Sequence, residues 1–359
     1  AMTFSIAYTD SAGNAGVADT SVDDSSTVTI DNTHPTVTSI AVNGVTSGSY
    51  GTASSYSVVV TASETLSAAP TLALTGGSVN SGTGSSSDTV WTYTFTPTDD
   101  DESVTIDVAV GAISDSAANT NTAAASQFAF THDATAPTMT ITSTTVSSGA
   151  TTNDATIALV FTSSESTANL ASGDVTLSAG SISSSFAGSG SSYSATFTPS
   201  GDATFTISIA AGAFTDAAGN NNAVSNSFTW TYDSTALTMT IASSTSGVTS
   251  GATTNDATIA LTFTSNEATT SLTADDVTIS GGTLSSFAGS GTDYTATFAP
   301  ASGGSSDATY TISIGAGTFT DGAGNSNTAS NSFTWTYDST SPTMVIASTT
   351  SGVTSGATT

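Results

Sequence analysis

The sequence has no lysine, no arginine and no cysteine among its 359 residues, and it has only two histidines. An ordinary soluble chain of this length carries roughly 40 basic residues, so their absence is a selected feature. Nucleic acids and anionic lipids are bound through Lys and Arg, which neutralise phosphate, so we expect no nucleic-acid partner. Arginine clamps, lysine Schiff bases and histidine-dependent catalysis are also disfavoured, and we expect no enzyme.

Long apolar runs are absent as well. None approaches the roughly 18 residues that cross a bilayer, so no membrane insertion is expected in this segment. The first ten residues, AMTFSIAYTD, contain neither a basic leader nor an apolar stretch, and we expect no signal peptide in them. The lack of Cys fits secretion of a thiol-free bacterial surface protein, although it does not prove it.

The sequence is rich in acidic residues, and its apolar residues alternate with polar ones. The chain carries 28 Asp plus Glu, a formal net charge of -28, and 37% hydrophobic residues. The apolar residues alternate with Ser and Thr in short runs such as 203–209 and 228–232, which is the period of a half-buried strand.

Three markers recur about 100 residues apart, too long a period for a solenoid and typical of tandem domains. The first is Asp-x-Ala-(Gly/Ala)-Asn, the second is Asp-x-Thr-x-Pro with Leu237 replacing Pro once, and the third is an acid after an early strand. The first begins at Asp10, Asp115, Asp216 and Asp321; the second at Asp31, Asp133, Asp233 and Asp338; the third is Glu64, Glu165 and Glu267.

These markers predict separate domains joined in tandem by linkers, like beads on a string. We expect residues 1–34 to be the end of a preceding repeat, 35–136, 137–236 and 237–341 to be three repeats, and 342–359 to be the first strand of another. In the second repeat we expect strands at 138–143, 155–162, 175–177, 181–186, 193–198, 203–210 and 227–233, with Gly-Ser-Gly turns at 188–190 and 289–291. About seven short strands per repeat predict an all-β fold of tandem immunoglobulin-like β-sandwiches.

Aromatic side chains recur on one face of the predicted final strand. Phe228, Trp230 and Tyr232 form one such row, and Phe333, Trp335 and Tyr337 form another. Phe95, Phe197 and Phe298 occupy one equivalent position, and all of these are predicted to be core. Histidines His34 and His132 flank linkers without equivalents in the other repeats, so we interpret them as incidental surface residues and not as zinc ligands.

The recurring acids are predicted to meet. In a sandwich with an odd number of strands, the linker, the end of the second strand and the loop before the last strand share the entry end. A lone Asp is often a turn residue, but three acids without any Lys or Arg repel unless a cation joins them. All-oxygen ligands favour Ca²⁺ over Mg²⁺. The predicted sets are Asp31, Glu64, Asp115 and Asn119; Asp133, Glu165, Asp216 and Asn220; and Asp233, Glu267, Asp321 and Asn325. Solvated acids without a metal are the alternative.

The three markers together resemble the bacterial Ig-like repeats that extend large secreted adhesins of the biofilm-associated and RTX-adhesin type. The resemblance covers essentially the whole chain, although Leu237 and Ala118 depart from its pattern. It implies an extracellular, calcium-stiffened spacer between a cell-surface anchor and a distal binding head.

The leading hypothesis is therefore a stalk segment that supports cell adhesion or biofilm formation, with calcium at the domain junctions. A second hypothesis is a self-assembling filament or sheath in which neighbouring copies of the chain contact one another. A third is an ice- or carbohydrate-binding module, suggested by Thr-x-Thr runs at 138–140 and 229–231. Thr is also an ordinary solvent-facing strand residue, so this third hypothesis ranks lowest.

Overall fold

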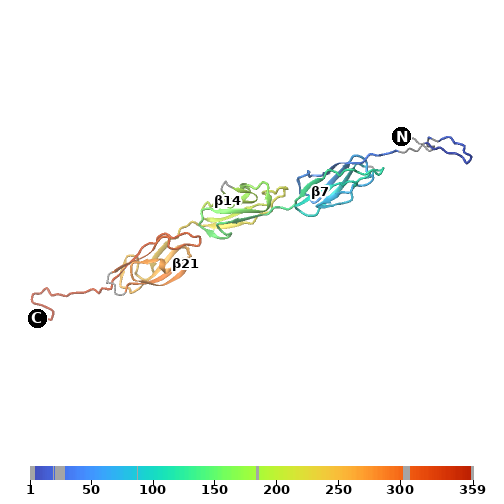
Figure 1. Ribbon diagram of the computed structural model, residues 1–359. Helices are drawn as coiled ribbons and strands as arrows, with labels where there is room; N and C mark the ends of the chain where they lie inside the picture. Colours follow the sequence, from blue (N-terminus) through green and yellow to red (C-terminus); the bar gives the residue numbers. More distant parts are fainter. Residues whose placement is uncertain are drawn as a thin grey trace. The chain divides into compact units, whose positions relative to one another are not determined.

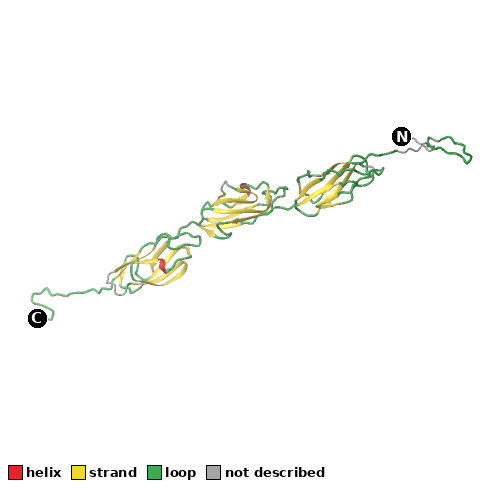
Figure 2. Ribbon diagram, viewed as in Figure 1, coloured by secondary structure: helices red, strands yellow, loops and turns green. Residues whose placement is uncertain are grey.

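The structure is a computed structural model that describes residues 5–18, 20, 29–86, 88–182, 186–301 and 308–356. Its regular elements in these ranges are β-strands and two single-turn 3₁₀ helices, η1 (Ser172–Asp174) and η2 (Ala274–Asp276), as Figure 2 shows. The strands build three sandwiches of two sheets each, which contain β7, β14 and β21 in Figure 1. The predicted all-β fold of tandem immunoglobulin-like sandwiches is confirmed.

The first sandwich pairs its strands in the orders β1-β3-β6-β5 and β2-β8-β7-β4. Alternation of apolar and polar residues explains the strands, because every second side chain of β3 is buried. The strands are β1 (Val37–Val42), β2 (Tyr50–Gly51), β3 (Tyr56–Ala62), β4 (Ala73–Thr75), β5 (Gly77–Val79), β6 (Val90–Pro97), β7 (Glu102–Asp107) and β8 (Phe128–His132).

The second sandwich has the orders β13-β14-β11-β9 and β10-β16-β15-β12. Its strands are β9 (Met139–Ser143), β10 (Thr151–Thr152), β11 (Ile157–Thr167), β12 (Val175–Leu177), β13 (Ser181–Ile182), β14 (Ala187–Thr198), β15 (Ala203–Ile209) and β16 (Phe228–Tyr232).

The third sandwich has the orders β17-β19-β21 and β18-β23-β22-β20, and its long β21 folds back on itself where the second sandwich has β13 and β14. Its strands are β17 (Met239–Ser243), β18 (Ala252–Thr254), β19 (Ile259–Thr269), β20 (Val277–Ile279), β21 (Thr283–Ala299), β22 (Ala308–Ile314) and β23 (Phe333–Tyr337).

By its internal contacts the chain divides into two compact units. Unit 1 consists of Ala1–Thr138, Ser163–Leu170 and Ala211–Ala223. Unit 2 consists of Met139–Thr162, Ala171–Ala210 and Val224–Thr359. The first linker and the second-sandwich loops that follow it therefore belong to unit 1, whereas the second linker and the whole third sandwich belong to unit 2.

A short early strand pairs in parallel with the last strand of each sandwich: β2 with β8, β10 with β16, and β18 with β23. In the second sandwich the Thr231 N–H donates to the Ala150 carbonyl at 2.9 Å. The Asp233 N–H donates to the Thr152 carbonyl at 3.1 Å. The first and last parts of a repeat are thus bonded side by side.

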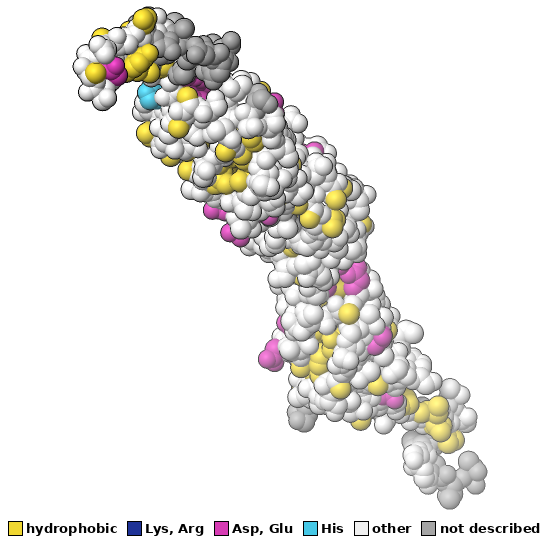
Figure 3. All heavy atoms as spheres, turned by 90° about the vertical axis from the view of Figure 1, so that its right-hand side faces the viewer, with side chains coloured by type: hydrophobic (Ala, Val, Ile, Leu, Met, Phe, Trp, Pro, Cys, Tyr) yellow, Lys and Arg dark blue, Asp and Glu magenta, His cyan; other side chains and the backbone are white. Residues whose placement is uncertain are grey.

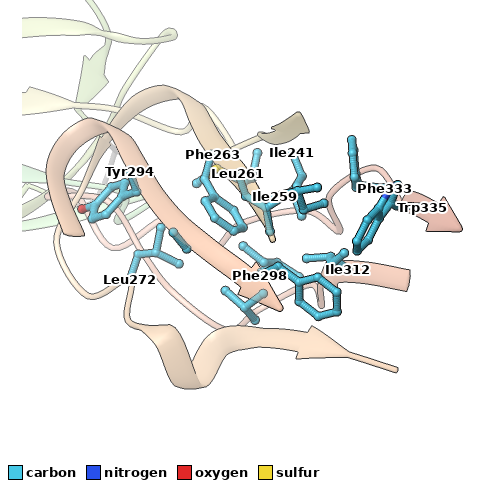
Figure 4. Close-up of a cluster of buried hydrophobic side chains, with 14 of the residues drawn as sticks. Ile241, Ile259, Leu261, Phe263, Leu272, Tyr294, Phe298, Ile312, Phe333 and Trp335 are labelled. Carbon is cyan, nitrogen blue, oxygen red and sulfur yellow. The ribbon is translucent and has the colours of Figure 1, made fainter. Parts of the chain in front are cut away.

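The core of each sandwich lies between its two sheets and is rich in aromatic residues. In the third sandwich, drawn in Figure 4, Phe298 and Trp335 are fully buried, and their rings meet edge to face with centroids 6.0 Å apart. Burial of such a side chain contributes about 2–3 kcal/mol. Phe95, Phe197, Phe228, Trp230 and Phe333 are buried as well, which confirms their core assignment, whereas Tyr232 and Tyr337 are half-buried.

The Gly-Ser-Gly segments lie inside β14 and β21, and the chain reverses there as predicted. Gly289 approaches Asp293 and Tyr294, and the Thr295 hydroxyl donates to the Ala288 carbonyl at 3.4 Å. Gly190 and Gly291 take φ of 65° and 68°, which suits a tight turn. One predicted detail is wrong: the early strand β11 runs on to Thr167, which places Glu165 within it instead of after it. Of the strand predicted at 181–186, residues 183–185 lie outside the described residues.

Candidate metal centres at the linkers

The loop before each last strand closes around its own aspartate. In the third sandwich Asp321 Oδ1 accepts the N–H groups of Ala323, Gly324 and Asn325 at 2.9, 2.7 and 2.8 Å. The Asn325 amide donates to Asp321 Oδ2 at 3.0 Å. Gly324 has φ of 96°, a left-handed conformation that explains the glycine of the motif. Asp115 and Asp216 accept the equivalent bonds.

The asparagine of this loop also ties the loop to the preceding linker. Asn325 Nδ2 donates to the Asp233 carbonyl at 2.9 Å. Asn119 Nδ2 donates to the Asp31 carbonyl at 3.1 Å, and Asn220 Nδ2 donates to the Asp133 carbonyl at 3.0 Å. An amide nitrogen cannot ligate a cation, so in this geometry the three asparagines position the loop. The ligand role predicted for them stays a prediction.

Each linker aspartate is fixed by a local turn. Its Oδ1 accepts the N–H of the threonine two residues later, an Asx turn that accounts for the Asp-x-Thr pattern. The distances are 2.9 Å from Thr33 to Asp31, 3.2 Å from Thr135 to Asp133, and 3.0 Å from Thr235 to Asp233. The linker backbone thereby places one carboxylate beside the loop that the asparagine holds.

The strand glutamate completes the group. Glu267 lies two residues beyond the buried Ser265 on β19, so its side chain leaves the same strand face at the end of the core. In the third sandwich one oxygen from each of Asp233, Glu267 and Asp321 lies within 4.8 Å of the others. The same holds for Asp31, Glu64 and Asp115 before the first sandwich.

The middle cluster differs. Its three mutually close carboxylates are Asp133, Glu165 and Asp101, and Asp216 is not one of the three. Asp216 still lies beside them, because Asn220 Nδ2 donates to Asp133 Oδ1 at 3.2 Å and to Asp216 Oδ2 at 3.0 Å.

The sequence reasoning missed Asp101, which comes from the turn between β6 and β7 of the first sandwich and has φ of 58°. The available signal was the run of acids at 99–102, which has no counterpart in the other repeats.

Burial and mutual repulsion raise the pKa of the strand glutamates. For Glu267, desolvation comes first, followed by the charges of Asp233 and Asp321. The pKa values of Glu64, Glu165 and Asp133 are raised for the same reasons, with desolvation again the largest cause. Hydrogen bonds from Asn119 lower the pKa of Asp115. The clusters therefore contain loop and linker aspartates that accept hydrogen bonds, beside glutamates whose charged form is disfavoured.

An open pocket of about 360 Å³ lies over the cluster of the second linker. Its lining includes Asp233, Glu267 and Asp321, and Thr151 from strand β10 also reaches it. Asn153, which follows β10, donates its N–H to the Ala323 carbonyl at 3.1 Å. The pocket is accessible to an ion and its waters, and residues of the second sandwich border it.

The donor set fits a hard divalent cation. Two oxygens bound to Ca²⁺ at 2.3–2.6 Å can be at most about 5 Å apart, and the carboxylate oxygens here lie within 4.8 Å. Three carboxylates leave room for carbonyl or water ligands, which calcium needs to reach six to eight. Exposed acids also occur together without an ion.

The two histidines differ from each other. His34 is exposed, as interpreted from the sequence, with Nδ1 2.8 Å from the Thr120 carbonyl. His132 is buried, so its interpretation as an incidental surface residue is wrong. Its Nδ1 lies 3.0 Å from the Tyr56 hydroxyl and its Nε2 lies 3.3 Å from Asp100. The available signal was the period of two, because His132 shares a strand face with Phe128 and Phe130 and stands where the other repeats have Tyr.

The fold and these clusters define a tandem array of Ig-like sandwiches with acidic linkers. Residues 133–232 and 233–337 match the family described as Bacterial Ig-like domain. The match covers more than half of the chain, and the chain belongs to this family. No curated protein matches it in sequence. Within the described residues no helix is long and apolar enough to span a membrane.

Solved structures with similar folds have low sequence identity. A three-domain titin fragment (I67–I69, an E-to-A variant) is 8% identical with a TM-score of 0.34, covering 85% of this chain and 98% of that one. Invasin, a bacterial integrin-binding protein, is 12% identical with a TM-score of 0.33, covering 77% and 56%. Surface layer protein SbsC, domains 1–6, is 14% identical with a TM-score of 0.19, covering 87% and 55%. These likenesses carry no information on function.

Proposed function

We propose that this chain is an extender segment of an extracellular bacterial surface protein, and that calcium stiffens its domain junctions in support of cell adhesion or biofilm formation. The observation that carries the proposal is the recurrence of one arrangement: a linker aspartate and a strand glutamate, joined by a loop aspartate at two of three linkers. A turn role explains each aspartate singly, but it does not explain why acids from separate elements converge in a chain without Lys or Arg.

A bound cation would act as a cross-link between the linker and the following sandwich. The linker carboxylate belongs to the segment that leaves one sandwich, whereas Glu267 and Asp321 belong to the next. Shared ligation restricts rotation about the linker, and removal of the ion restores carboxylate repulsion. The residues that would hold calcium are Asp31, Glu64 and Asp115; Asp101, Asp133, Glu165 and Asp216; and Asp233, Glu267 and Asp321.

The surface charge fits a spacer. Acidic side chains on the face in Figure 3 stand in small groups separated by uncharged surface, and no Lys or Arg lies among them. A single sign of charge keeps neighbouring chains soluble and apart. We propose no catalytic role and no nucleic-acid partner, because the composition lacks the side chains that either would use.

The test is calcium titration of the full chain by calorimetry, followed by small-angle scattering with calcium and with chelator. Glu267→Gln removes one carboxylate of the third cluster, and Asp275→Asn removes an exposed acid outside the clusters. We expect E267Q to weaken one class of sites and D275N to leave every site intact.

Chelation of the wild type should broaden the scattering-derived distribution of distances. An unchanged scattering profile, or titration without heat, would refute the calcium role. Reproducible lateral association that depends on protein concentration would instead favour the filament or sheath hypothesis.

A further inference from the structure

An aspartate in a hairpin turn of the first sandwich forms hydrogen bonds with the linker that follows. Asp100 lies in the turn between β6 and β7. Its Oδ1 accepts the Ala134 N–H at 3.2 Å, and its Oδ2 accepts the Thr135 hydroxyl at 3.2 Å. The buried His132 holds the same carboxylate, with Nε2 3.3 Å from Oδ1. These contacts all lie within unit 1.

The same arrangement recurs at the second linker, with more hydrogen bonds. Asp202, in the turn between β14 and β15, accepts the Ser234 N–H at 2.8 Å and the Ser234 hydroxyl at 2.7 Å on Oδ1. Its Oδ2 accepts the Thr235 hydroxyl at 3.0 Å. The Ser234 hydrogen bonds lower the pKa of Asp202, which therefore stays ionised at neutral pH. These contacts all lie within unit 2.

Strand register explains the recurrence. Glu102 pairs with His132 in the antiparallel ladder of β7 and β8, and Ala203 pairs with Tyr232 in that of β15 and β16. A residue just before the first strand of such a pair lies next to residues just after the second. An acid at the end of this turn therefore reaches the first residues of the linker, whatever the turn's own sequence.

We propose that Asp100 and Asp202 are latch residues that fix each linker to the preceding sandwich without a cation, through the threonine of the Asp-x-Thr motif. The threonine then has two functions. Its N–H closes the Asx turn on the linker aspartate, and its hydroxyl binds the latch acid. This inference does not depend on calcium, because the latch bonds use protein donors only.

The latch divides the restraint of a junction into two parts. The proximal half joins the linker to the sandwich before it and persists in chelator. The distal half joins the linker to the sandwich after it and is the part that a cation would strengthen. Loss of the latch should therefore loosen the junction even when the acidic cluster is intact.

The test uses the full chain with two spin labels. The protein has no cysteine, so Thr176→Cys and Thr278→Cys, exposed and equivalent positions on β12 and β20, are labelled without background. Thr235→Val removes the hydroxyl at nearly constant shape, and Asp202→Ala removes the acceptor. Thr240→Val, on an exposed position of β17, is the matched control.

In chelator, we expect Thr235→Val and Asp202→Ala to broaden the distribution of inter-label distances, and the double variant to be no broader than Asp202→Ala alone. In Asp202→Ala, amide exchange at Ser234 should speed up by about tenfold or more, because its N–H loses a charged acceptor. Thr240→Val should match the parent in both measurements.

Unchanged distances in both latch variants, with unchanged exchange in Asp202→Ala, would overturn the proposal. Circular dichroism checks that each variant is folded. If Asp202→Ala does not fold, the result for Thr235→Val decides the question alone. The result is independent of the calcium proposal, which is tested separately by comparing the parent's distances in chelator and in calcium.

Discussion

Replacement of Glu267 by Gln should change stability in opposite directions with and without calcium. Without a cation, burial raises the pKa of Glu267, and repulsion from Asp233 and Asp321 raises it further. The neutral amide of nearly the same shape removes that repulsion, so the third sandwich should become more stable in chelator. With calcium the same change removes a ligand, so the variant should lose the stabilisation that binding gives.

The magnitude follows from the geometry. Two unit charges at the 4.8 Å limit repel by about 0.9 kcal/mol in water, and salt near physiological strength reduces this by roughly half. Two such pairs give about 1 kcal/mol, which is the appropriate scale because the cluster is open to solvent. For a sandwich of this size, that corresponds to a rise in Tm of about 4–8 °C.

The stabilisation by bound calcium is larger than the loss of stability from carboxylate repulsion. A ligand at 100 times its dissociation constant stabilises the folded state by about 2.7 kcal/mol. A tenfold loss of affinity in Glu267→Gln would remove about 1.4 kcal/mol of that at fixed calcium. The variant should thus melt above the wild type in chelator and gain less from calcium than the wild type does.

Differential scanning calorimetry of the full chain in the two buffers measures both effects, and Asp275→Asn serves as the control for removal of one exposed charge. A variant that is less stable than the wild type in chelator would show that Glu267 is held by favourable contacts instead of repulsion. Equal calcium gains in the variant and the wild type would remove Glu267 from the binding site.

Three further outcomes are expected. In chelator, stability should fall as pH rises from about 4 towards 7. The raised pKa values of Glu165 and Glu267 mean that the folded state binds more protons than the unfolded state. Melting temperatures measured against pH test this, and calcium should reverse the slope. Ala118→Gly should stabilise the first sandwich by about 0.5–1 kcal/mol in urea titration, because Ala118 is held at φ 68° where the equivalent loops have glycine; no gain would mean that the loop relaxes around alanine. Phe298→Ala should cost the third sandwich about 3–5 kcal/mol in the same assay, since the ring is fully buried, and a cost below 1 kcal/mol would contradict the packing described.

Alternation made the fold predictable. Strands such as β15 and β16 place every second side chain in the core, and that period is visible in the sequence without any knowledge of partners. The Gly-Ser-Gly segments were recognised as turns because a tight chain reversal requires the positive φ that Gly190 and Gly291 take. Burial of His132 follows from the same alternation, but its contacts with Tyr56 and Asp100 were not predictable, since only the folded sheets bring those residues near it.

The site was predictable where repetition provided a signal. Asp233, Glu267 and Asp321 stand at equivalent positions in each repeat, and a topological argument was enough to bring them to one end. Asp101 was not predictable in this way, because it belongs to a single repeat and reaches the cluster through its own backbone turn. Fine geometry, such as the direction of the Asn220 amide, depends on hydrogen bonds that the spacing of residues does not specify.

The parallel pairing of an early strand with the last strand has a mechanical consequence. A pull on the two ends of a repeat loads β10 and β16 along their length and in opposite directions. The hydrogen bonds between them then share the force in shear and must break together, whereas a hairpin opened from its tip loses them one at a time. Tension that reaches this pair is therefore resisted by a few backbone bonds acting together.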